Sequence, residues 1–129
     1  MTGNPSTGPS AFRDGDDIFY NNSPTAAFFA ISWATERVEK RGGLKANFAS
    51  GYARSDAFED FAETFAAYTL HRPMLEKRAT TNAAIAAKLT WMETYLPLEE
   101  NIFGPSSYSW TGKTPWDITL LPYAANLTQ

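Results

Sequence analysis

Residues 50–70 read SGYARSDAFEDFAETFAAYTL and contain the clearest helical pattern in the chain. Asp56 followed by Glu59 three residues later fits a capping box, which places the start of a helix near Ser55 or Asp56. Apolar side chains then recur at helical spacing, and we expect this side of the helix to pack into the core. That side comprises Phe58, Phe61, Ala62, Phe65, Tyr68 and Thr69. The opposite side, which we expect to face solvent, comprises Asp60, Thr64, Ala67 and His71.

A second helix is predicted from about Thr81 to Tyr95, with Ile85, Leu89 and Met92 on one side and Pro97 closing it. Pro73 either ends the first helix or begins the next element, because proline disrupts a helix interior. The two helices together predict an α-hairpin. After Pro97 the sequence becomes rich in loops and aromatic residues, and residues 116–121 alternate like a short strand. The expected class is mainly α.

The N-terminal part has a different composition. Residues 1–10 are Gly, Pro, Ser and Thr with few other residue types, so we assign residues 1–17 to a flexible lead-in or to the seam of a truncated protein. Residues 18–129 are then a single, partial domain. Within it, Ser23 and Pro24 could open a helix, and the apolar run Phe28–Trp33 predicts a short helix or an extended segment.

The composition excludes several classes of site and partner. The 129 residues include no cysteine, which excludes disulfides, thiolate zinc sites and cysteine nucleophiles. His71 is the one histidine, so a site with two histidines cannot form within a single copy of the chain. The net charge of −3 argues against a nucleic-acid partner, and no apolar run is long enough for a membrane span. We see no signal peptide in this chain.

Glu59 and Glu63 stand one helical turn apart and are therefore neighbours on the helix surface, in the same stripe as Ala66 and Leu70. One interpretation is a solvated helix face on which Glu59 completes the capping box. The other is that one carboxylate binds a cation or a proton donor while the second orients a neighbouring ligand. The sequence pattern alone leaves both interpretations open.

Residues 50–65 resemble the downstream half of a zinc metallopeptidase site of the gluzincin type, related to anthrax lethal factor. In these peptidases a tyrosine precedes a Glu-x-Phe-Ala-Glu helix by seven residues, as Tyr52 precedes Glu59 here. The resemblance implies that Glu59 is a zinc ligand and that Glu63 orients a zinc-bound histidine. It further implies that Tyr52 donates a hydrogen bond to the developing oxyanion.

The family places its two histidine ligands and its general base on an upstream His-Glu-x-x-His helix, and this chain contains no such motif. The resemblance therefore implies a missing N-terminal part that bears it, a Zn²⁺ cofactor in the complete domain, and a peptide or protein substrate. It also favours an extracellular location. The alternative is a non-catalytic helical module for protein interaction.

If a histidine-bearing helix normally covers this face, its absence leaves the face open. We therefore expect both carboxylates at the mouth of a groove bordered by Tyr52, with Ala66 and Leu70 partly exposed.

Overall fold

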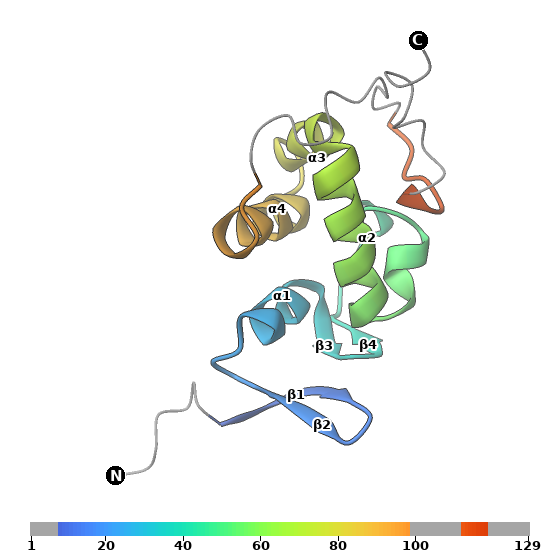
Figure 1. The fold of residues 1–129 in the computed structure, drawn as a ribbon. Helices are drawn as coiled ribbons and strands as arrows, with labels where there is room; N and C mark the ends of the chain where they lie inside the picture. Colours follow the sequence, from blue (N-terminus) through green and yellow to red (C-terminus); the bar gives the residue numbers. More distant parts are fainter. Residues whose placement is uncertain (1–7, 99–111, 119–129) are drawn as a thin grey trace.

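The computed structural model of the chain describes residues 8–98 and 112–118 (Figure 1). This part of the chain contains four α-helices and two short antiparallel β-hairpins, so the predicted mainly α class is confirmed. The helices are α1 (Pro24–Ser32), α2 (Ala57–Leu70), α3 (Arg72–Ala79) and α4 (Ala83–Tyr95). The strands are β1 (Pro9–Asp14), β2 (Asp17–Tyr20), β3 (Trp33–Thr35) and β4 (Val38–Glu39). Two 3₁₀ turns, η2 (Lys45–Asn47) and η3 (Tyr52–Ser55), precede α2.

The first hairpin corrects the prediction for the N-terminus. Residues 9–17, assigned above to a flexible lead-in, form β1 and the start of β2, which pair antiparallel at one end of the molecule (Figure 1). Gly15 makes the turn with a φ of 61°, which a residue with a side chain adopts only under strain. Phe12 is buried against Phe29, 5.3 Å between ring centroids. The hairpin is thus held by a partner distant in the sequence, which composition does not reveal.

Helix α1 begins at Pro24 with Ser23 in the N-cap position, as one of the two predictions for this segment has it. It delivers Phe28 to the centre of the core, where its ring meets Phe61 at 5.1 Å and Trp91 at 5.4 Å. The Trp91 indole N–H donates to the Pro24 carbonyl at 2.7 Å. Edge-to-face ring contacts of this kind add to the burial of apolar area. They connect α1, α2 and α4.

The helix boundaries agree closely with the sequence prediction, but the connection between the helices does not. The Asp56 carboxylate accepts from the Glu59 N–H at 2.8 Å and begins α2, and the Asn82 side chain caps α4 in the same way. Pro73 lies in the first turn of α3, an additional helix between the two predicted ones. The expected α-hairpin is therefore a three-helix arrangement, because Pro73 is tolerated in a first turn and starts a helix there.

The buried side of α2 differs from the predicted one. The four residues expected to face solvent are all fully buried, whereas Ala62 and Phe65, expected in the core, are exposed. The reason is that α2 is covered on two sides. Phe58 and Phe61 pack toward α1, and the Asp60 side packs against α4, where its polar groups find partners.

One further prediction concerns the C-terminal part, and another concerns membrane spans. The described residues 116–118 of the predicted strand 116–121 form no strand, and residues 119–121 lie outside the described residues. Within residues 8–98 and 112–118, none of the helices combines the length and the apolar character needed to cross a bilayer.

Candidate functional site

Tyr52 and Glu59, the two residues at the centre of the resemblance, lie next to each other. Tyr52 begins η3, and the Asp56 cap fixes the start of α2 so that Glu59 stands in its first turn. A hydrogen bond between the phenol and the Glu59 carboxylate raises the pKa of Tyr52 above its ordinary value, and the negative charge of Glu59 adds to the effect. Tyr52 is 39% exposed, so this pair is accessible from solvent.

Glu63 lies one turn further along α2 but is buried. Its Oε1 accepts from the Ser50 hydroxyl at 2.5 Å and from the Ile118 backbone N–H at 3.0 Å. The expectation that both carboxylates stand at the mouth of an open groove is therefore wrong for Glu63, because residues near Ile118 cover it. Ala66 and Leu70 are partly exposed, as expected.

We expect Glu63→Gln to lower the free energy of unfolding by about 1–2 kcal/mol, since the bonds from Ser50 and Ile118 lose their charged acceptor in a buried position. Urea denaturation measures this loss. The matched control is Glu76→Gln, which removes an exposed carboxylate on α3 and should stay within about 0.5 kcal/mol of the parent. A Glu63→Gln variant as stable as this control would contradict the role of Glu63 as a buried acceptor.

The loop of residues 45–50, which leads into Tyr52, is held by hydrogen bonds from side chains of α3 and α4. The Arg78 guanidinium is buried and donates to the carbonyls of Ala46, Phe48 and Ala49 at 2.7–3.2 Å. The Lys88 ammonium donates to the Asn47 carbonyl at 2.8 Å and lies 4.2 Å from the centre of the Phe48 ring. These bonds hold the backbone that presents Tyr52 in one conformation.

Asp60 and Lys88 form a fully buried ion pair, 3.0 Å between Nζ and Oδ2. The Asp60 carboxylate also accepts from the Trp33 indole N–H at 3.0 Å and from the Thr64 hydroxyl at 3.2 Å. Burial raises the pKa of Asp60, and Lys88 and the two hydrogen bonds oppose that rise. A carboxylate enclosed in this way cannot meet a substrate, so we assign the pair to structure. The one feature of the sequence that indicates this buried ion pair is the position of Lys88, three residues after Ile85 on the apolar side of α4.

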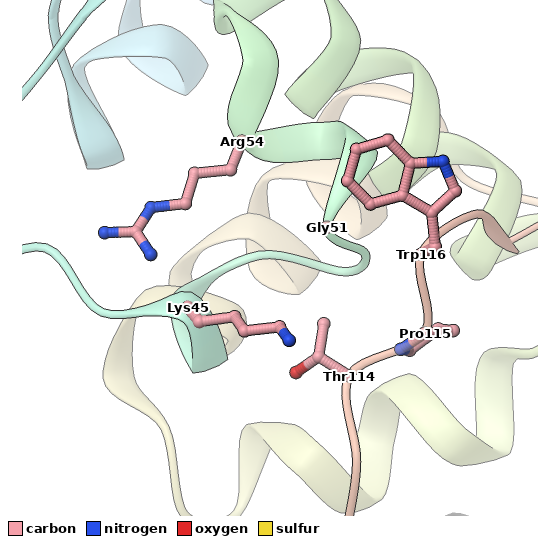
Figure 2. Close-up of a pocket in the computed structure, with 6 residues that line it drawn as sticks. All are labelled: Lys45, Gly51, Arg54, Thr114, Pro115 and Trp116. Atoms are coloured by element: carbon pink, nitrogen blue, oxygen red, sulfur yellow. The ribbon is translucent and has the colours of Figure 1, made fainter.

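A cavity of about 360 Å³ opens beside Tyr52 (Figure 2). Its lining comprises Lys45, Gly51, Arg54, Thr114, Pro115 and Trp116. The Trp116 ring is also in contact with the Tyr52 ring, 6.0 Å between centroids, so the cavity adjoins the Tyr52–Glu59 pair. Helical and motif patterns did not identify this cavity, because its two sides come from segments about sixty residues apart.

The Tyr52–Glu59 contact makes a spectroscopic prediction. We expect Glu59→Gln to lower the pKa of the Tyr52 phenol toward its ordinary value of about 10, because the charge that disfavours the phenolate is removed. NMR of the chain labelled with ¹³C at the tyrosine ζ carbon measures this pKa, and Tyr52→Phe assigns the signal. Glu76→Gln, distant on α3, should leave it unchanged. An unaltered Tyr52 pKa in Glu59→Gln would show that the two side chains do not interact.

His71 does not join this site. It lies at the junction of α2 and α3, fully buried rather than on the surface as expected, and burial lowers its pKa. Across residues 8–98 and 112–118, no group of three His, Asp or Glu side chains lies close enough together to hold a metal ion.

Comparison with protein-family models, with curated proteins and with solved structures finds no match to this chain.

Proposed function

We propose that this chain is the C-terminal part of a zinc metallopeptidase catalytic domain, which hydrolyses peptide bonds only together with a part that bears His-Glu-x-x-His. The observation that carries the proposal is the contact between Tyr52 and Glu59. A metal ligand and the phenol that assists the same reaction must both reach one substrate carbonyl. Here the Glu59 carboxylate is near enough to raise the pKa of the Tyr52 phenol, and Tyr52 is exposed.

The residues present do not complete a zinc site. Glu59 offers one carboxylate, whereas a catalytic zinc site uses three protein ligands, and the described part of the chain holds no cluster of that size. What this chain's own residues do is more limited. The loop fastened by Arg78 and Lys88 positions Tyr52, the Asp56 cap positions Glu59, and the phenol holds its proton to a higher pH.

Glu63 fits the role of orienting a histidine only after a rearrangement. Its Oε1 is bonded to Ser50 and to the Ile118 N–H, so a histidine-bearing helix would have to share that acceptor or displace residue 118. This internal bonding is the observation that favours the second candidate, a non-catalytic helical module for protein interaction.

Expression of the reading frame extended upstream by about a hundred codons tests the proposal. The proposal requires His-Glu-x-x-His in that extension and chelator-sensitive cleavage of casein by the extended protein. Cleavage should be lost in Glu59→Gln and retained in Glu76→Gln, which removes a carboxylate from the exposed face of α3. An extension without the motif, or an extended protein without zinc-dependent cleavage, would favour the interaction module.

The isolated chain gives a complementary test by isothermal titration with ZnCl₂. We expect only weak binding, because one carboxylate ligand cannot replace three. A stoichiometric submicromolar site that is lost in Glu59→Ala would instead show that copies of this chain complete a metal site among themselves.

A further inference from the structure

The cavity beside Tyr52 is built from two segments whose backbones are bonded to each other. The Gly51 N–H donates to the Pro115 carbonyl at 2.7 Å, and the Tyr52 N–H donates to the Trp116 carbonyl at 2.8 Å. The Trp116 ring packs directly on Gly51, where an added Cβ would lie 2.6 Å from the ring. Residues 114–116, which form one wall of the cavity, are therefore held against the backbone of Gly51 and Tyr52.

The two cationic side chains of this cavity are not equivalent. Arg54 is paired with Glu39, 2.8 Å between Nε and Oε1, and also donates to the Gly43 carbonyl. Lys45 is exposed and has no ion-pair partner among the described residues. Its ammonium extends toward the Thr114 side chain across the cavity (Figure 2). One uncompensated positive charge therefore remains in the cavity, in a chain whose net charge is −3.

The opposite wall is apolar and accessible. Trp116 is 66% exposed and stands beside Pro115, so an indole face is available to a ligand that enters the cavity. A ligand that satisfies both walls carries an anionic group for Lys45 and an adjoining apolar group for Trp116. A peptide with a carboxylate next to an apolar side chain has this chemistry.

We propose that this cavity is a peptide-binding subsite that takes a carboxylate at Lys45 and the adjoining apolar side chain on Trp116. As a substrate subsite it rests on the proposed function, because the contact between Trp116 and Tyr52 places it next to the reacting pair. The carboxylate belongs to an acidic side chain or to the free C-terminus of the peptide.

Titration of the full chain with three peptides, followed by ¹⁹F NMR of 5-fluorotryptophan, tests the subsite and separates the two sources. The peptides are acetyl-Ala-Ala-Glu-Leu-Ala-amide, its Gln counterpart, and the Gln counterpart with a free C-terminus. Trp116→Phe assigns the Trp116 signal. We expect at least one carboxylate peptide to bind about fivefold more tightly than the uncharged amide, with the difference shrinking at high salt.

Lys45→Gln should abolish that preference while leaving the weak binding of the uncharged peptide. The matched control Lys77→Gln, which removes an exposed lysine on α3, should retain it. Equal binding of all three peptides, or a preference that survives in Lys45→Gln, would overturn the subsite.

This titration needs neither zinc nor a histidine-bearing part. Its failure would therefore leave the peptidase proposal standing, and a failure of the extended protein to cleave casein would leave the binding result standing.

Discussion

Lys88→Met is expected to lower the free energy of unfolding by about 3–5 kcal/mol, the cost of leaving a buried charge without its partner. In the variant the Asp60 carboxylate keeps only the Trp33 and Thr64 donors in a fully buried position. The Asn47 carbonyl loses its donor as well, so the loop that presents Tyr52 is loosened at one point. Urea denaturation at neutral pH measures the loss.

The dependence of this loss on pH has a definite sign. Burial already raises the pKa of Asp60, and removal of Lys88 takes away the charge that opposes this rise. A carboxyl whose pKa is higher in the folded than in the unfolded state binds its proton more tightly when folded. Its contribution to stability therefore falls as pH rises through the interval between the two pKa values. We expect Lys88→Met to be less destabilised at pH 5 than at pH 8.

Two companion variants separate the buried charge from the loss of packing. Asp60→Asn combined with Lys88→Met removes both charges and leaves the Trp33 N–H an acceptor, so it should recover part of the loss. Lys77→Met, at an exposed position of α3, should change stability by no more than about 0.5 kcal/mol. A Lys88→Met variant as stable as Lys77→Met would show that the ion pair contributes nothing to the fold.

The same ion pair explains why the helix ends could be predicted from the sequence but the buried side of α2 could not. The ends of α2 and α4 were predictable because capping is local: Asp56 and Asn82 bond to N–H groups three residues away. The buried side of α2 was not predictable from a helical wheel. Asp60 is buried because Lys88 and Trp33, about twenty-seven residues away in either direction, supply the donors that make its burial tolerable.

The candidate site also combines features that the sequence predicts with features that depend on long-range packing. The spacing of Tyr52 and Glu59 is local, and the two residues are in contact. The burial of Glu63 depends on Ile118, fifty-five residues further along the chain, and no sequence motif predicts that contact. The cavity at Trp116 likewise requires residues 114–116 to lie beside Gly51. Pairings of this range are set by tertiary packing, which a single sequence does not display.

Arg78→Met is the second variant with a large expected effect, a loss of about 3 kcal/mol in the free energy of unfolding. Three loop carbonyls lose a charged donor in a buried position, and hydrogen bonds to charged groups contribute about 1.5–3 kcal/mol each without adding fully. Arg78→Lys keeps the charge but lacks the planar fork that reaches several carbonyls together, so we expect an intermediate loss.

A local measurement distinguishes the fastening of the loop from a general loss of stability. The Phe48 N–H bonds within the loop to the Lys45 carbonyl, and the Ala53 N–H bonds to the Ser50 hydroxyl. Hydrogen exchange of these two amides should accelerate in Arg78→Met by more than that of amides in the middle of α4. The control is Arg72→Met, which removes a half-exposed arginine paired with Glu93. If both variants accelerate exchange equally throughout the chain, Arg78 does not hold the loop.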